Sequence, residues 1–330
     1  MKNRPEPDTV TAAACEWLQA GGKEGGYSGP DPGDDHDLAP LLARETGRRG
    51  MALLSESIWI RREEAVMPVL RRLGAAGITV WAFKGFDLAR SLYPFTGARS
   101  MSDIDLFLRT GARGPVLEAF RDHGWTVATP GRGVFASGIV SEVKLRKLDT
   151  MAELHSHIFY FPATFPGSLP HDLFRGGRRL APGLLAFSWH NSLLMVALHA
   201  LINSWMRPVW WVDLSLLCNK VTETGTWREF TLNATRTRLG PSIHSLLAVV
   251  SSNLCAEVPG KVLDMLESQG SDGEAILEGL RKGKKVPTLM SLRYLNGWRR
   301  SSWFYTLIWM IISRRRFQVW ENLPRIPPQL

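Results

Sequence analysis

The segment Asp103-Ile104-Asp105-Leu106-Phe107-Leu108 places two acidic residues inside an apolar run. In an extended strand, residues two apart project from the same face of the sheet, so these carboxylates are expected to lie side by side. Asp is depleted in strands, and the apolar neighbours indicate burial. Carboxylates that close repel each other unless a cation neutralises them, and a hard divalent cation does so best. The segment therefore predicts a buried metal site, against the alternative of a surface strand with two solvated acids.

A strand, a tight corner and a short helix are predicted just before this segment. Residues 78–83 have the pattern of a buried strand that ends at Lys84-Gly85, and residues 86–93 have a helical pattern. Glycine lets the backbone approach a ligand, a helix N-terminus offers free N–H groups, and lysine adds positive charge. Because this corner precedes the acidic strand, we predict that Lys84 and Gly85 bind phosphate.

A third acidic residue lies on a later predicted strand. Residues 140–148 alternate in strand fashion, and residues 151–158 are predicted to form the next strand, with Glu153, His155 and His157 on one face. Two-metal sites for phosphoryl transfer commonly use three carboxylates from neighbouring strands. Glu153 is therefore the predicted third ligand.

The predicted ligands also indicate which ion would bind. Oxygen ligands favour Mg²⁺ or Mn²⁺, and two ions are expected. The scattered cysteines Cys15, Cys218 and Cys255 lack the spacing of zinc ligands, so zinc is disfavoured. We therefore predict that His155 supports the metal ligands or positions the substrate.

At these positions the sequence resembles the polymerase-beta-like nucleotidyltransferase superfamily. Within it, the chain is most similar to the uncharacterised nucleotidyltransferase family of bacterial biosynthetic clusters. The motifs that carry the resemblance are Lys84-Gly85, Tyr93-Pro94, Arg99, Asp103-Ile104-Asp105-Leu106 and Glu153-Leu154-His155. Similarity extends over residues 35–260, and Ser100 departs from the usual proline.

The resemblance implies transfer of a nucleoside monophosphate, expected to be AMP, from a nucleoside triphosphate to an acceptor, with release of pyrophosphate. The implied catalytic residues and metal ligands are Asp103, Asp105 and Glu153. The implied nucleotide-binding residues are Lys84, Gly85, Arg99 and Ser102, whose cation and hydroxyl groups would balance and contact the phosphates. The alternatives are a salt bridge from Arg99 to Asp103 or Asp105 and a turn-forming role for Ser102. The cluster context implies a natural-product or surface-polysaccharide precursor as acceptor.

The implied fold is α/β (α+β), with a polymerase-beta-like nucleotidyltransferase core built on a mixed sheet. An N-terminal helical segment and a C-terminal helical domain are expected to flank this core. We predict a linker and helical segment over residues 1–76, the catalytic core over 77–160, and a helical domain with a basic, aromatic tail over 161–330. The helices expected after the core span residues 184–205, 209–220, 227–239 and 242–254.

Composition is that of an ordinary folded protein. The chain has 330 residues, of which 45% are apolar and 22% charged. Few cysteines and an N-terminus without an apolar signal core predict a cytoplasmic location. The net charge of +9 favours anionic partners such as nucleotides, phosphorylated sugars or acidic lipids. A nucleic-acid partner is less favoured, because no recognition motif accompanies the charge.

The basic, aromatic tail at residues 299–316 indicates a possible function other than catalysis. Residues 303–312 are apolar and arginines bracket them, but about ten apolar residues are too few to span a bilayer. This pattern therefore predicts that the segment 299–316 either docks onto the helical domain or contacts a membrane peripherally. A non-catalytic nucleotide-binding protein or a membrane-peripheral assembly protein that retains the fold is the alternative to an enzyme. The intact set of acids and Lys84 favours the enzyme.

Overall fold

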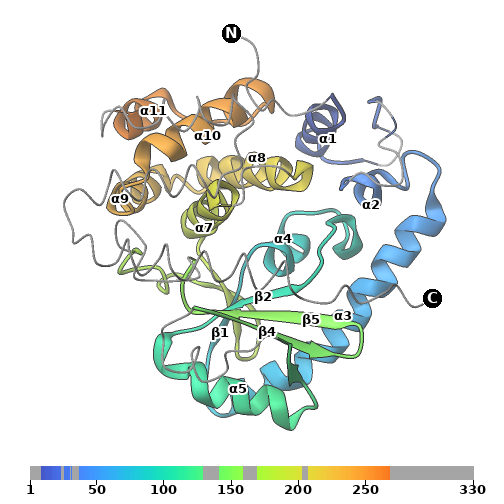
Figure 1. The fold of residues 1–330 in the computed structure, drawn as a ribbon. Coiled ribbons are helices and arrows are strands. Elements are labelled where there is room, and N and C mark those ends of the chain that lie inside the picture. The colour runs from blue at the N-terminus through green and yellow to red at the C-terminus, as the bar shows by residue number, and fades with distance from the viewer. Residues whose placement is uncertain are drawn as a thin grey trace, which may run out of the picture.

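A seven-stranded mixed sheet forms the centre of the described part of the chain (Figure 1). The computed structural model describes residues 9–23, 26–29, 31, 37–128, 141–158, 169–202 and 207–267. The strand order is β3-β4-β5-β2-β1-β7-β6. The strands are β1 (Val80–Ala82), β2 (Ile104–Phe107), β3 (Thr126–Val127), β4 (Glu142–Lys147), β5 (Thr150–His155), β6 (Arg178–Ala181) and β7 (Leu184–Ala186).

Strand β2, which carries the acidic motif, is the central strand. It runs antiparallel to β1 and parallel to β5, and this parallel register pairs Asp105 with Glu153. On the far side of β5, the antiparallel strand β4 pairs Lys144 with Glu153. The predicted mixed sheet is confirmed, and its pairing brings the acids of two distant segments together.

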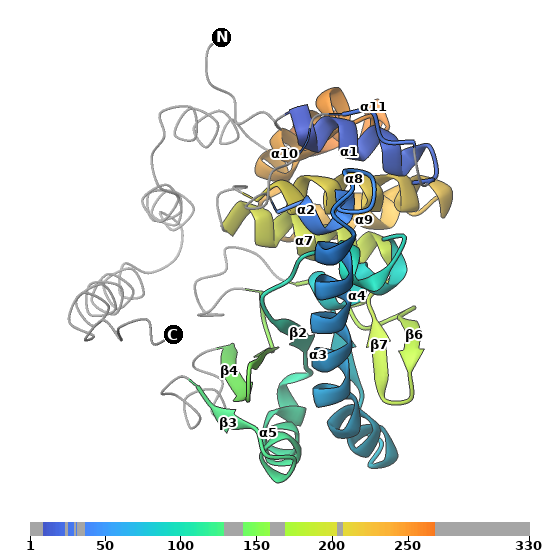
Figure 2. The same ribbon diagram turned by 90° about the vertical axis from the view of Figure 1, so that its right-hand side faces the viewer.

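Helices cover both faces of the sheet (Figures 1 and 2). The long helix α3 runs beside the sheet, and α5 lies on the same face as α3. The helices that follow β7 pack on the opposite face together with α1. Their bounds are α1 (Thr9–Gln19), α2 (Ala39–Leu42), α3 (Arg49–Ala75), α4 (Gly85–Ser91), α5 (Arg113–Asp122), α7 (Trp189–Ile202), α8 (Pro208–Glu223), α9 (Trp227–Arg236), α10 (Gly240–Asn253) and α11 (Gly260–Glu267).

Strand alternation divides the apolar side chains between two cores. Ile104 and Leu106 of β2 pack with side chains of α3 and α5. Phe107 points to the other face and packs in the core that α7 and α8 complete. Because Asp105 lies two residues before Phe107, it shares that second face. The acidic motif therefore lies between the sheet and the helical layer.

The segment after residue 160 differs from the sequence prediction. Residues 184–186 form strand β7 instead of the start of a helix, and α7 begins only at Trp189. Strands β6 and β7 join the edge of the sheet beside β1, so the sheet extends beyond the boundary expected at residue 160. Pro182 and Gly183 form the turn between these two strands, and Gly183 has φ of +76°.

Other predicted elements are found close to their expected positions. The strand at residues 78–83, the helix at 86–93 and the helices near 209–220, 227–239 and 242–254 are all present. The inner face of α3 is formed by its buried side chains Trp59, Val66, Val69, Leu70 and Leu73.

The predicted tail at residues 299–316 lies outside the described residues. Among the helices of the described part of the chain, none has both the length and the apolar content needed to cross a bilayer.

Candidate metal and nucleotide site

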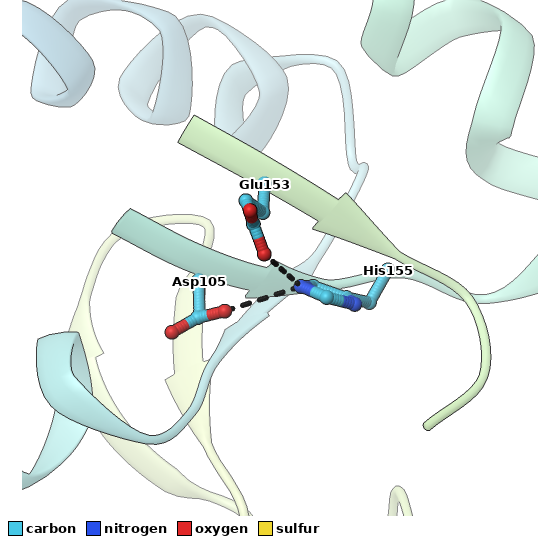
Figure 3. Close-up of side chains that lie close together, drawn as sticks. All are labelled: Asp105, Glu153 and His155. Atoms are coloured by element: carbon cyan, nitrogen blue, oxygen red, sulfur yellow. Dashed lines mark hydrogen bonds and ion pairs between the residues drawn. The ribbon is translucent and has the colours of Figure 1, made fainter. Parts of the chain in front are cut away.

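Three buried side chains converge on the face of the sheet that the helical layer covers (Figure 3). The Nε2 atom of His155 lies 3.1 Å from Oδ1 of Asp105 and 3.4 Å from Oε2 of Glu153. Register places Glu153 beside Asp105, and strand alternation places His155 on the same face. Each of the three residues is at most 7% exposed. The cluster could hold a divalent cation, since one ligand atom from each residue lies within 4.8 Å of the others.

Lys84 contributes a positive charge that contacts Asp105 of this cluster. Its Nζ atom lies 2.7 Å from Oδ1 of Asp105. Burial opposes ionisation of Asp105, but Lys84 and His155 outweigh burial and hold the pKa of that carboxyl well below its usual value. The backbone of Lys84 has φ of +51° and ψ of −132°, a conformation that costs an L-residue on the order of 1–3 kcal/mol. Such strain is typical of functional positions, and here it directs the lysine toward the acids.

Gly85 follows Lys84 and begins α4, as the sequence predicts. A Cβ atom at this position would lie 2.5 Å from Nη1 of Arg99 and 3.1 Å from Cβ of Met101. The glycine is therefore required for close packing of the Arg99 side chain against the corner. Whether Gly85 also contacts phosphate stays a prediction.

Asp103 lies at the edge of the cluster, one residue before β2. It is half-buried and accepts a hydrogen bond from the Ser102 hydroxyl at 3.0 Å. Burial, together with the negative charges of Asp105 and Glu153, raises the pKa of Asp103 to about 6. The predicted role of Asp103 as a metal ligand is untested, and Ser102 is placed to orient it.

The raised pKa of Asp103 predicts a pH dependence of cation binding. Below a pH of about 6, Asp103 takes up a proton and no longer attracts a cation, so metal affinity should fall as the pH is lowered through this value. Calorimetric titration of the metal on both sides of that pH would measure the change. The variant Asp103→Asn should show a flatter profile, and an equally steep profile in that variant would assign the dependence to another group.

Lys144 on β4 is a further member of the site that sequence reasoning did not identify. Its Nζ atom forms an ion pair with Oε1 of Glu153 and lies 3.7 Å from Glu142. Burial disfavours the charge of Glu153, but hydrogen bonds from His155 and Lys144 outweigh it and lower its pKa to about 2. Alternation along residues 140–148 indicates the face of Lys144, but only the register of β4 against β5 reveals its partner.

Arg99 has a different partner from those expected. Its Nε and Nη2 atoms donate to the two carboxylate oxygens of Asp213 on α8, at 2.9 and 2.5 Å. The Tyr93 hydroxyl donates to the same carboxylate at 2.8 Å, and Nη1 of Arg99 donates to the Ser100 carbonyl at 3.1 Å. The salt bridge considered for Arg99 is therefore made to Asp213 and not to Asp103 or Asp105. This network joins the segment before β2 to the helical layer.

His199 approaches the site from helix α7. Burial, followed by the positive charge of Lys84, holds the pKa of His199 well below its usual value, so the imidazole is neutral at physiological pH. The charges of Asp105, Glu153 and His155 also influence its pKa. Its ring packs edge-on against Trp210 with centroids 4.9 Å apart. The sequence favours a core or interface role for this histidine, and its nearness to the acids could be found only from the fold.

Comparison with known proteins gives one result. A sequence model for a protein family, described as an uncharacterised nucleotidyltransferase, matches residues 62–254, more than half of the chain. The matched range contains the sheet, the acidic cluster, Lys84 and the pair formed by Arg99 and Asp213. Neither the curated proteins nor the solved structures provide a match.

Proposed function

The chain belongs to the uncharacterised nucleotidyltransferase family, and from this premise we propose that it transfers a nucleoside monophosphate from a nucleoside triphosphate to an acceptor. AMP is the proposed group, and a natural-product or surface-polysaccharide precursor is the proposed acceptor. The observation that carries the proposal is the pairing of Asp105 with Glu153 on adjacent strands, with Lys84 Nζ 2.7 Å from Asp105. This arrangement combines carboxylates for cations with a cation for phosphate.

The residues present fit a divalent cation. Asp105 and Glu153 are buried side by side, and both have lowered pKa values, so both carry charge at neutral pH. Asp103 adds a third carboxylate at the cluster's edge. These residues would hold Mg²⁺ or Mn²⁺, which when bound neutralises phosphate oxygens and makes the α-phosphorus more electrophilic.

The chain's own residues have defined tasks in the proposed transfer. A nucleophilic atom of the acceptor forms a bond to the α-phosphorus, and the bond from this phosphorus to the bridging oxygen of pyrophosphate breaks, so pyrophosphate leaves with that electron pair. We assign the acceptor's proton to Glu153, which the strand register places beside Asp105. Lys84 would balance the charge of the triphosphate, as fixed cations do in such reactions.

Calorimetric titration of the four nucleoside triphosphates in the presence of Mg²⁺ tests this proposal. Wild type should bind at least one triphosphate in a metal-dependent manner, and the double variant Asp103→Ala/Asp105→Ala should not bind it. Circular dichroism would confirm that both proteins are folded. Equal binding by the wild type and the double variant would show that the nucleotide binds elsewhere.

Replacing Lys84 with methionine is expected to weaken nucleotide binding more than metal binding. A charge-assisted hydrogen bond contributes about 1.5–3 kcal/mol, so loss of this cation should lower triphosphate affinity by about 10- to 150-fold. In the absence of nucleotide, metal affinity should be unchanged or higher, because Lys84 no longer competes for Oδ1 of Asp105. Calorimetry with each ligand separately would measure both effects.

A matched lysine elsewhere provides the control. Lys220 forms an exposed ion pair with Glu223 at 2.6 Å on α8, so Lys220→Met should leave both affinities unchanged. Unaltered triphosphate affinity in Lys84→Met would remove Lys84 from the phosphate site.

A further inference from the structure

We propose that His155 is itself a metal ligand, so that Asp105, Glu153 and His155 form a mixed nitrogen and oxygen site for a divalent transition ion. This inference rests on the proposed function and changes one part of the sequence prediction, in which three carboxylates were the ligands and His155 only supported them. Under this assignment, Asp103 is not a ligand of the ion that these three residues hold.

The distances between the three side chains agree with coordination of one ion. For metal–ligand bonds of about 2.1 Å, adjacent ligand atoms lie about 3.0 Å apart in octahedral geometry and about 3.4 Å apart in tetrahedral geometry. His155 Nε2 lies 3.1 Å from Asp105 Oδ1 and 3.4 Å from Glu153 Oε2. Figure 3 shows both carboxylates directed at this same nitrogen. The ligand atoms therefore need little rearrangement to share an ion, which would replace the proton that Nε2 of His155 donates to these carboxylates in the absence of an ion.

The surroundings of His155 hold its ring in the orientation that a ligand requires. The ring packs edge-on against Phe83, with centroids 5.1 Å apart. Its other nitrogen, Nδ1, lies 3.9 Å from Oε2 of Glu142, the residue paired with His155 across β4 and β5. Histidines that bind metals commonly direct their second nitrogen toward a carboxylate, which fixes the tautomer and raises the basicity of the ligating nitrogen. At 3.9 Å Glu142 makes an electrostatic contact and not a hydrogen bond, and a small movement of its side chain would bring it into that role.

The presence of a nitrogen ligand changes which ion the site prefers. Mg²⁺ is a hard ion that favours oxygen ligands and retains several waters, whereas imidazole suits first-row transition ions. A site with two carboxylates and one imidazole should therefore bind a transition ion more tightly than Mg²⁺. Mn²⁺ is the suitable probe, because it accepts both donor types and is paramagnetic.

Electron paramagnetic resonance of Mn²⁺ bound to the full chain tests the assignment. The echo-modulation spectrum of wild type should show coupling to a directly bound ¹⁴N nucleus. In His155→Gln, whose amide oxygen can approach the position of Nε2, this coupling should disappear. The Mn²⁺ affinity should fall at least about tenfold, the lower end of the losses seen for altered metal-site partners. Mg²⁺ affinity should change less, so the preference for Mn²⁺ over Mg²⁺ should shrink.

A second histidine serves as the control. His123, the residue that follows α5, donates from Nδ1 to the Ala119 carbonyl at 2.8 Å, so His123→Gln should keep the ¹⁴N coupling and the ion preference. If His155→Gln fails to fold by circular dichroism, His155→Asn is measured in its place.

The outcomes separate this inference from the proposed function. Absence of ¹⁴N coupling in wild type that binds Mn²⁺, or its persistence in the folded His155 variant, would overturn the role of His155. If that same wild type still binds a nucleoside triphosphate in a metal-dependent manner, the proposed function stands without a histidine ligand. Wild type that binds neither Mn²⁺ nor any triphosphate would overturn both.

Discussion

Replacing Asp105 with alanine is expected to abolish nucleotidyl transfer while the chain stays folded. Oδ1 of Asp105 is the atom at which Lys84 and His155 meet, at 2.7 and 3.1 Å. Loss of this central anion removes a metal ligand, and we expect a decrease on the order of a thousandfold in kcat, comparable to removal of a directly acting group in other active sites. The chain should stay folded but be less stable, because Lys84 loses its buried partner at 2.7 Å. Relief of the repulsion that Asp105 exerts on Asp103 and Glu153 offsets part of this loss.

Metal-dependent release of pyrophosphate from the triphosphate that binds, with water as the attacking nucleophile in place of the acceptor, would measure this loss. Circular dichroism would monitor the fold. Asp149 provides the matched control, because it is an exposed acid in the turn between β4 and β5, with its ion pair to Arg61 at 3.3 Å. Asp149→Ala should retain wild-type activity. Full metal-dependent activity in Asp105→Ala would show that the site is assigned wrongly.

The sequence predicts the parts of the site that depend on local periodicity. Alternation along each strand places Glu153 and His155 on one face, and the acids of the central strand are recognisable because they interrupt an apolar run. The order of the motifs, through their resemblance to a known family, indicates that the two strands belong to one site. The corner at Lys84-Gly85 is predicted from the strand pattern before it and the helical pattern after it.

Contacts between distant segments could not be predicted in this way. Local periodicity determines which face a side chain occupies, but it does not determine which strand or helix lies beside it. The ion pair of Arg99 with Asp213 joins residues 114 positions apart, and the ion pair of Lys144 with Glu153 depends on strand register. His199 reaches the site only because α7 packs over the sheet. These three contacts are tertiary in origin.

Strands β6 and β7 were missed for a different reason. Strand β6 contains only four residues and β7 only three. The apolar residues of β7 lie just before those of α7, so the helical pattern begins at residue 184 in the sequence but at Trp189 in the structure. The proline and glycine at positions 182 and 183 predict a turn, but a turn there does not distinguish a following strand from a following helix.

Replacing Asp213 with asparagine is expected to lower the free energy of unfolding by about 3–5 kcal/mol, the usual result of removing one partner from a buried ion pair. The side chains of Arg99 and Asp213 are 5% and 1% exposed, so water cannot replace the lost carboxylate. Asparagine keeps the shape of the side chain but leaves a buried guanidinium without an opposing charge. Urea denaturation would show a lower midpoint with an unchanged slope.

Two further variants test whether charge is the cause. Glu223→Gln removes the partner of an exposed lysine on the same helix and should change stability by less than about 0.5 kcal/mol. Arg99→Met/Asp213→Leu removes both charges and should recover much of the loss, because apolar side chains of similar size can replace a buried ion pair. Equal stability of Asp213→Asn and Glu223→Gln would contradict a buried ion pair.

The same substitution should also affect the proposed site, although Asp213 belongs to the helical layer. Asp213 binds the guanidinium of Arg99. Nη1 of Arg99 packs directly against Gly85, where the Cβ of any other residue would clash with it. If Arg99 loses its anchor, the corner that directs Lys84 toward Asp105 loses the side chain packed against it. Triphosphate affinity should therefore fall together with stability in folded Asp213→Asn, whereas Lys84→Met should lower affinity alone. This difference separates a residue that positions the corner from one that binds phosphate.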